Sequence, residues 1–166
     1  MDIILRINII LKQELFISQL EGYQATMLLV HKHLIVRAEV TNPPKDVVFI
    51  KDWFKQLVDK IGMKIMIGPI AEYCHMKGNR GLTCIAVIET SHIALHTWDE
   101  VSPSIIQLDV YSCGHFKIDE IIAHLSQFNP TKVEYKYLDR EHDLKLISEC
   151  EESCGLENTT QFKLAV

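Results

Sequence analysis

The apolar residues between positions 27 and 138 recur with two spacings, and each spacing predicts one type of element. Short apolar runs, most of them containing β-branched residues, predict strands at residues 27–40, 64–67, 82–89, 91–98 and 105–112. Alternation of apolar and charged residues predicts a further strand at residues 133–137. Apolar residues at intervals of three and four predict helices at residues 45–61 and 118–128. The first helix has its stop at Gly62, and the second at Asn129 and Pro130.

This order of elements predicts an α+β fold. Two helices are too few to cover both faces of a sheet, so we expect a two-layer sandwich, a mainly antiparallel sheet with both helices on one face. The continuous apolar run at residues 85–88 indicates a strand buried on both faces. We therefore expect the open face to pack on a second copy of the chain, as a homodimer, or on the N-terminal segment.

The remaining segments are more polar or are interrupted by charges. We expect an N-terminal extension at residues 1–26, one domain at residues 27–138 and a polar C-terminal tail at residues 139–166, weakly ordered at 151–160. Residues 71–81 are predicted to form a loop. The apolar runs of the extension are far shorter than the roughly 20 residues of a membrane-spanning helix. We expect no membrane-spanning helix there and favour an amphipathic helix or an extra strand that packs on the domain or on a partner subunit, ahead of an interfacial membrane anchor.

Composition narrows the class of protein. At 166 residues the chain suits one domain with a single core. Its net charge of −5 argues against a nucleic-acid partner, because such proteins normally show a basic face. The five cysteines form an odd number without framework spacing, and no secretory signal pattern is evident. We therefore expect a reducing cytoplasm as the location.

Polar side chains within one predicted strand mark a candidate site. Residues 90–100 contain a serine and two histidines and end at an acid, in a segment that otherwise resembles buried strand. An unpaired polar atom in apolar surroundings costs about 1–3 kcal/mol, so we expect these groups to be retained for a function. On the next predicted strand run Cys113 follows a serine, so a thiol and a serine could meet across one sheet. Because His92, His96 and Cys113 lack the four-ligand spacing of a zinc site, we expect no metal.

Four short motifs resemble those of the S-adenosylmethionine decarboxylase proenzymes of bacteria and archaea. They are GLT at residues 81–83, IETSH at 88–92, HTWDE at 96–100 and DVYSCG at 109–114. The resemblance extends from about residue 31 to about residue 137 and keeps the order of elements. It implies a self-processing enzyme of polyamine (spermidine) biosynthesis. Its electrophile would be a pyruvoyl group made from its own serine, without an added cofactor.

The resemblance implies self-cleavage of the bond between Thr90 and Ser91. The Ser91 hydroxyl would attack the Thr90 carbonyl to give an ester, and elimination would cut the chain and leave dehydroalanine, which hydrolyses to pyruvoyl. His96, at the position of the family's processing histidine, would move protons. Thr83, where the family usually has serine, would hold the intermediate by a hydrogen bond.

The resemblance also implies how a small-molecule substrate is handled. The substrate amine would form a Schiff base with the pyruvoyl group, which withdraws electrons as carbon dioxide leaves. Cys113, matching the family's catalytic cysteine, would reprotonate the α-carbon. Glu100 matches an acid that binds ribose hydroxyls, and Tyr73 lies near the region expected for an aromatic residue that stacks on adenine.

Departures from the family pattern keep other functions open. Thr90 replaces the usual glutamate, and its β-branched side chain crowds the carbonyl. The interval from Ser91 to Cys113 is two residues longer than usual, and His115 stands where the family often has an acid. A pyruvoyl-dependent ornithine or arginine decarboxylase is therefore one alternative. An unprocessed relative that binds a ligand or regulates a partner without catalysis is another.

Strand geometry adds one expectation about this site. Alternate residues of a strand share a face, so His92, Ala94 and His96 lie on one face and Ser91 on the other. Ser91 and His96 can serve one site only if the chain bends near residues 90–92. Strained backbone at such a bend would also assist an acyl shift.

Overall fold

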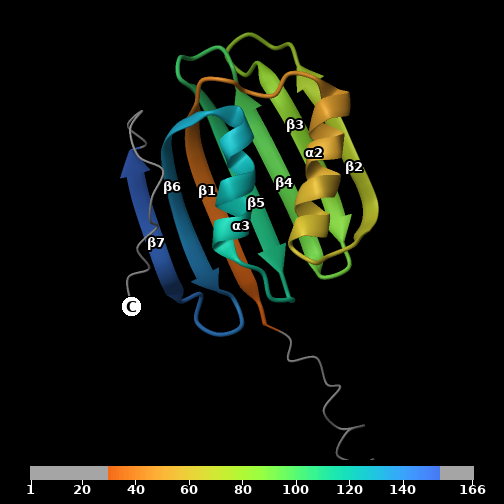
Figure 1. Cartoon of the computed structure of the whole chain (residues 1–166), viewed down its shortest axis with the longest axis vertical. Helices are drawn as coiled ribbons and strands as arrows, with labels where there is room; N and C mark the ends of the chain where they lie inside the picture. The colour runs from red at the N-terminus through yellow and green to blue at the C-terminus, as the bar shows by residue number, and fades with distance from the viewer. Residues whose placement is uncertain (1–29, 154–166) are drawn as a thin grey trace, which may run out of the picture.

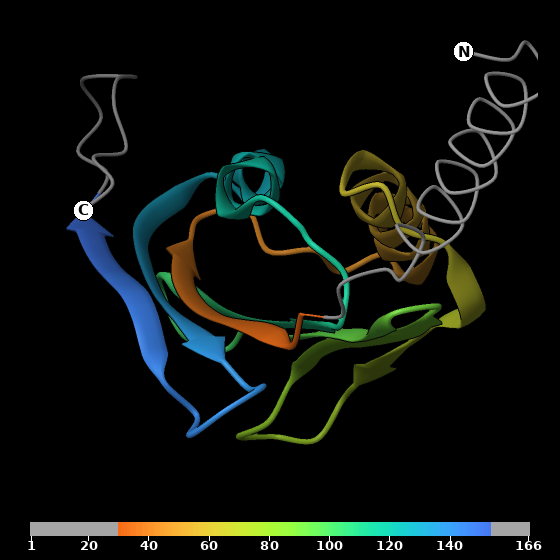
Figure 2. The same cartoon turned by 90° about the horizontal axis from the view of Figure 1, so that it is seen from below.

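The computed structural model describes residues 30–153, which fold into two layers (Figures 1 and 2). Within them, a seven-stranded antiparallel sheet has the order β2-β3-β4-β5-β1-β6-β7. The strands are β1 (Lys32–Val40), β2 (Ile65–Cys74), β3 (Gly81–Ile88), β4 (Ser91–Trp98), β5 (Ser104–Ser112), β6 (Pro130–Asp139) and β7 (Leu146–Ser153). The helices are α2 (Val47–Lys60) and α3 (Ile118–Leu125), followed by the 3-10 turn η1 (Ser126–Phe128). Both helices cover one face of the sheet, which confirms the predicted α+β sandwich. The expected N-terminal extension lies outside the described residues.

The face of the sheet under the helices forms the hydrophobic core. Along β4, Ile93 and Leu95 are fully buried, whereas His92 and His96, which alternate with them, are not. The buried side chains of α2 recur at helical spacing: Ile50, Trp53, Phe54, Leu57 and Val58. The Asp46 side chain caps this helix by accepting hydrogen bonds from its first backbone N–H groups. Packing of the helices on one face therefore leaves the other face of each strand open.

β2 is longer than the sequence predicts. The predicted strand stops at Gly68 and Pro69, but β2 continues to Cys74. The prediction of a loop is therefore wrong for residues 71–74. β2 is an edge strand, where proline is tolerated, and its pairing with β3 shifts register in the interval that contains this dipeptide.

β7 lies in the segment that the sequence analysis assigns to the polar tail. It pairs with β6 along most of its length. Two ion pairs cross between these strands: Lys132 Nζ is 2.7 Å from Glu151 Oε1, and Lys136 Nζ is 3.8 Å from Glu149 Oε2. The strand was missed because its support comes from backbone pairing with β6, which the pattern within the segment does not show.

Candidate active site at the turn between β3 and β4

A tight turn joins β3 to β4 and carries the residues of the predicted cleavage. Ile88 pairs with Ser91 across the hairpin, so Glu89 and Thr90 form a two-residue turn. Ser91 has a φ of +151°, a region that residues with side chains rarely adopt and that costs of order 1–3 kcal/mol. The bend predicted near residues 90–92 is therefore present at the bond between Thr90 and Ser91.

The carbonyl group of Thr90 is held by the segment that follows β5. Its oxygen accepts a hydrogen bond of 2.9 Å from the backbone N–H of Cys113. Gly114 lies against Thr90, since a Cβ atom added to it would be 3.2 Å from Thr90 Cγ2. The Ser112 hydroxyl is 2.8 Å from the Gly114 nitrogen and 3.0 Å from its carbonyl oxygen, which fixes this segment. The serine and cysteine motifs thus meet across β4 and β5, as predicted.

Thr83 and His96 form a second group on the open face. They lie opposite each other on β3 and β4, and Thr83 Oγ1 is 3.0 Å from His96 Nδ1. His96 lies five positions along β4 from Ser91, which corresponds to about 16 Å. The family resemblance predicts all three residues in one site, but within a single chain Thr83 and His96 lie apart from Ser91.

Glu100 and Tyr73 lie toward the other end of the hairpin from Ser91. Glu100 Oε2 accepts hydrogen bonds from the backbone N–H groups of Gly78, at 2.6 Å, and Arg80, at 3.3 Å. The Tyr73 hydroxyl donates to Asp99 Oδ2 at 2.7 Å, and this hydrogen bond, together with burial, raises the pKa of the phenol. A hollow of about 500 Å³ lies here, lined by Lys45, Tyr73, His75 and Arg80. A ligand in this hollow would be far from the turn of the same chain.

A polar cluster that the sequence analysis leaves without a role lies beside Ser91. Asp109 Oδ2 on β5 is 2.7 Å from His33 Nε2 on β1, and Asp109 Oδ1 is 3.5 Å from His92 Nε2 on β4. His92 Nδ1 is in turn 3.3 Å from Ser91 Oγ. Burial would raise the pKa of Asp109, but the hydrogen bond to His33 and the electrostatic influence of His33, His92 and Arg140 hold it below its ordinary value. Only the pairing of β1, β4 and β5 brings these side chains together.

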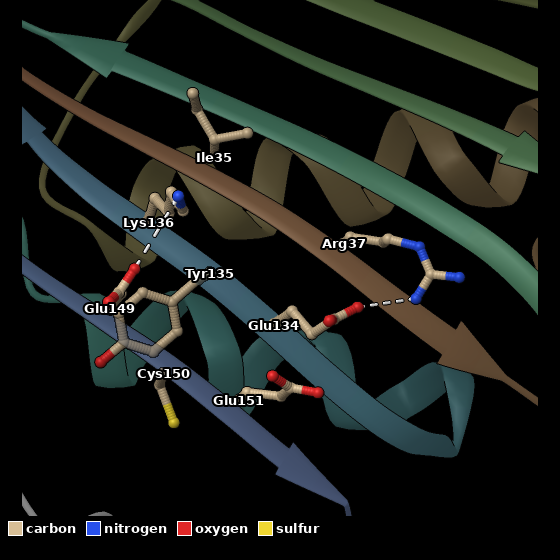
Figure 3. Close-up of a pocket in the computed structure, with 8 residues that line it drawn as sticks. All are labelled: Ile35, Arg37, Glu134, Tyr135, Lys136, Glu149, Cys150 and Glu151. Carbon is tan, nitrogen blue, oxygen red and sulfur yellow. Dashed lines mark hydrogen bonds and ion pairs between the residues drawn. The ribbon is translucent and has the colours of Figure 1, made fainter.

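A second hollow, of about 540 Å³, lies over β1, β6 and β7 (Figure 3). Two ion pairs cross it, Arg37 with Glu134 at 2.7 Å and Lys136 with Glu149 at 3.8 Å. Its lining consists of Ile35, Arg37, Glu134, Tyr135, Lys136, Glu149, Cys150 and Glu151. None of these residues belongs to the four motifs, so this hollow is separate from the predicted chemistry.

Two further observations concern residues 30–153 only. None of the helices in this part is long and apolar enough to cross a membrane. This part also has no group of three or more His, Cys, Asp or Glu side chains arranged to hold a metal ion.

The chain is similar to known proteins over most of its described length. A family model described as S-adenosylmethionine decarboxylase matches residues 32–141. The S-adenosylmethionine decarboxylase proenzyme of Archaeoglobus fulgidus is 24% identical over 115 residues, covering 68% of this chain and 99% of that protein. The proenzyme of Methanococcus maripaludis is 35% identical over 68 residues, covering 40% of this chain and 54% of that protein. The crystal structure of the adenosylmethionine decarboxylase from Aquifex aeolicus has a TM-score of 0.52 at 19% identity, covering 80% of this chain and 98% of that one.

Proposed function

Because this chain belongs to the S-adenosylmethionine decarboxylase family, we propose that it is a pyruvoyl-dependent decarboxylase that cuts itself between Thr90 and Ser91. S-adenosylmethionine is the proposed substrate, and the product would serve polyamine synthesis, including that of spermidine. The observation that carries the proposal is the turn, where Ser91 has a φ of +151° next to the Thr90 carbonyl.

Two features of the turn favour the first step of self-cleavage, in which Ser91 Oγ bonds to the Thr90 carbonyl carbon. The backbone N–H of Cys113, 2.9 Å from the Thr90 oxygen, can stabilise the negative charge that develops there. Strain at Ser91 can be released when its peptide bond breaks. The Ser91 nitrogen then becomes a free amine, and an ester joins the two residues.

Elimination from this ester completes the cleavage. The Cα proton of Ser91 is removed, its Cβ–O bond breaks, and Thr90 becomes a new carboxyl terminus. Water hydrolyses the remaining dehydroalanine, which releases ammonia and leaves a pyruvoyl group. That group supplies electron withdrawal as carbon dioxide leaves the substrate. Cys113, whose backbone contacts Thr90, is the proposed donor of the proton that replaces the carboxylate.

We further propose that the active enzyme is a homodimer in which the open sheet faces pack together. Thr83 and His96 lie too far from Ser91 in the same chain to act on its peptide bond, at about 16 Å along the strand. In a two-fold dimer, this pair from one subunit can face Ser91 of the other. Apolar side chains that are 40% to 58% exposed on the open face support such a contact: Ile35, Ile67, Ile70, Ile85 and Val87.

Intact mass spectrometry of the purified protein tests self-cleavage. We expect two fragments, residues 1–90 and 91–166, the second without a free amino group at its N-terminus. The matched control, Ser91→Ala, should give a single full-length mass. A wild-type chain that stays whole after long incubation would contradict the proposal and would favour an unprocessed relative that binds a ligand without catalysis.

Release of carbon dioxide by the cleaved protein tests the substrate. We expect release from S-adenosylmethionine and none from ornithine or arginine. Prior treatment with borohydride, which reduces the carbonyl of a pyruvoyl group, should abolish it. Release from ornithine or arginine alone would keep the pyruvoyl chemistry and replace the proposed substrate.

Coexpression of two inactive variants tests the homodimer. Ser91→Ala and His96→Ala should each remain uncut when expressed alone. In a mixed dimer, the Ser91→Ala subunit can supply an intact His96 to the Ser91 of the His96→Ala subunit, so we expect the His96→Ala chain to be cut. If the coexpressed chains remain whole while the wild type is cut, His96 does not act across subunits.

A further inference from the structure

We propose that His92 is the base that takes the proton from the Ser91 hydroxyl during self-cleavage, and that Asp109 and His33 position its imidazole ring. This inference rests on the function proposed above and adds a catalytic residue to it. The sequence resemblance assigns proton transfer to His96, whereas the histidine in contact with the reacting oxygen of its own chain is His92.

His92 lies beside the reacting oxygen. Its Nδ1 atom is 3.3 Å from Ser91 Oγ, and no other side chain within residues 30–153 hydrogen-bonds this hydroxyl. General bases act from about 2.6–3.2 Å, and such contacts commonly shorten when the reacting complex forms. His96 Nδ1 is instead hydrogen-bonded to Thr83. Because the His92 side chain is 50% exposed, its ring has room for this small movement.

Asp109 favours the tautomer of His92 that this role requires. His92 Nε2 is 3.5 Å from Asp109 Oδ1, an oxygen that is shielded from solvent and accepts no hydrogen bond from the described residues. An ionised carboxylate can only accept, so it favours a proton on Nε2. The lone pair of Nδ1 is then available to Ser91. Serine, imidazole and carboxylate thus follow the order in which a serine is activated in hydrolytic triads.

The rest of this cluster holds Asp109 in place. His33 Nε2 is 2.7 Å from Asp109 Oδ2, so the carboxylate bridges two imidazole rings. The Tyr111 ring packs beside both of them, with centroids 5.7 Å from His92 and 5.8 Å from His33. Arg140 lies 4.0 Å from the centroid of the Tyr111 ring, which adds a positive charge near the carboxylate. These contacts restrict the orientation of the carboxylate and therefore that of His92.

In the proposed step, His92 carries one proton from the Ser91 hydroxyl to the Ser91 nitrogen. The proton passes from Ser91 Oγ to His92 Nδ1 as Oγ bonds to the Thr90 carbonyl carbon. Asp109 stabilises the imidazolium ion that results. The imidazolium then gives the proton to the Ser91 nitrogen as the bond between that nitrogen and the Thr90 carbon breaks. The acyl shift therefore needs no co-reactant and leaves the total number of protons unchanged.

Substitution of His92 with hydroxylamine trapping tests this role. Under mild conditions hydroxylamine cleaves esters and leaves peptide bonds intact, so it cuts any chain that has completed the acyl shift. We expect His92→Ala to slow cleavage about 100-fold or more and to yield no fragments with hydroxylamine. His92→Asn keeps a hydrogen-bond acceptor but cannot take up a proton, and it should be equally slow. The control His142→Ala, which removes a histidine with an 81% exposed side chain, should be cut like the wild type.

Rescue by imidazole separates a missing base from a distorted turn. The His92 side chain is 50% exposed in a single chain, so added imidazole can enter the space left in His92→Ala before two chains associate, and we expect it to speed cleavage of that variant at least about tenfold. It should leave Ser91→Ala uncut. Asp109→Asn should slow cleavage about 10- to 100-fold without rescue, because its His92 is still present.

The outcomes distinguish this inference from the proposed function. A wild-type chain that is never cut overturns both together. If the wild type is cut, this inference alone is overturned by any of three results: His92→Ala cut within about threefold of the wild-type rate, an ester in His92→Ala that hydroxylamine cleaves, or no rescue by imidazole.

Discussion

The face of the sheet under α2 and α3 is apolar, whereas the opposite face carries most of the candidate chemistry. On β4, Ile93 and Leu95 are fully buried under the helices, while His92 and His96 alternate with them on the open face. On β5, Asp109 is likewise on the open face, between buried apolar neighbours. One strand thus contributes its alternate residues to two different tasks. Substitutions on the two faces should therefore have separable effects on stability and on chemistry.

At the turn, Ser91 departs from the alternation of side chains between the two faces of β4. Strict pleating would direct Ser91 to the helix-covered side, since it pairs with the fully buried Ser112. The unusual φ of Ser91 instead lets its hydroxyl contact His92, a residue of the open face. The backbone conformation of this one residue therefore brings the Ser91 hydroxyl to the polar cluster.

The largest expected effect is on the helix-covered face. Leu95→Ala should lower the free energy of unfolding by about 2–5 kcal/mol, because Leu95 is fully buried and its loss leaves a cavity. Ile85→Ala, on the open face of β3 and 45% exposed in a single chain, is the matched control and should cost less than about 1.5 kcal/mol at protein concentrations low enough to keep the chain monomeric. Urea unfolding measures both, in Ser91→Ala backgrounds so that the chain stays whole. Equal losses would contradict the division between the faces.

On the open face, Thr83→Val should affect chemistry and leave stability nearly unchanged. The substitution keeps the β-branched shape but removes the hydroxyl that lies 3.0 Å from His96 Nδ1. We expect self-cleavage to slow about tenfold, which corresponds to about 1.4 kcal/mol in the barrier. The fraction cut over time, followed by mass, gives the rate. Thr83→Ser, which keeps a hydroxyl at this position, should be cut at least as fast as the wild type.

The pKa of the Cys84 thiol tests whether water is excluded from the helix-covered face. Burial raises the pKa of this thiol from 9.0 to about 12, so the folded chain keeps it neutral. The unfolded chain loses this proton first as pH rises, so the contribution to stability is complete below pH 9 and declines between pH 9 and 12. Between pH 8 and pH 10 the free energy of unfolding of the wild type should fall by roughly 1 kcal/mol more than that of a Cys84→Ala variant. If the two proteins lose the same free energy of unfolding between pH 8 and pH 10, water reaches the thiol in the folded chain.

The smallest expected effect is at the edge strand β7. Glu151→Gln removes a carboxylate whose Oε1 is 2.7 Å from Lys132 Nζ but whose side chain is 69% exposed. Such pairs contribute about 0.2–1 kcal/mol and weaken as salt screens them. Unfolding of the variant and the wild type should converge at 1 M salt. A larger loss that is insensitive to salt would mean that β7 depends on this residue for more than its charge.

The success of sequence prediction differed between elements for physical reasons. β3, β4, β5 and both helices follow from apolar spacing, because each buries one side and the pattern is local. The end of β2 was missed because a Gly-Pro pair usually ends a strand but is tolerated at an edge. β7 was missed because polar residues there are supported by β6.

At the candidate site, too, the sequence predicted the residues within each motif but not the contacts between strands. The motifs locate Thr90, Ser91 and Cys113, and the structure brings these residues together at the turn. Thr83 and His96 lie in hydrogen-bond contact, which the sequence analysis did not predict, and they remain distant from Ser91 in one chain. The pattern along the chain contains residue spacings, but distances across a sheet depend on strand order and register.

The amino-acid sequence by itself determined the family, the two-layer fold and the bond at which a cleavage is expected, because these depend on local spacing and on motifs. The tertiary structure alone decided that His33 on β1 and Asp109 on β5 meet His92 beside Ser91. It also decided the backbone conformation of Ser91. Strand pairing brings His33 within 2.7 Å of Asp109, 76 positions away in the sequence, and no periodicity within a segment encodes such a contact.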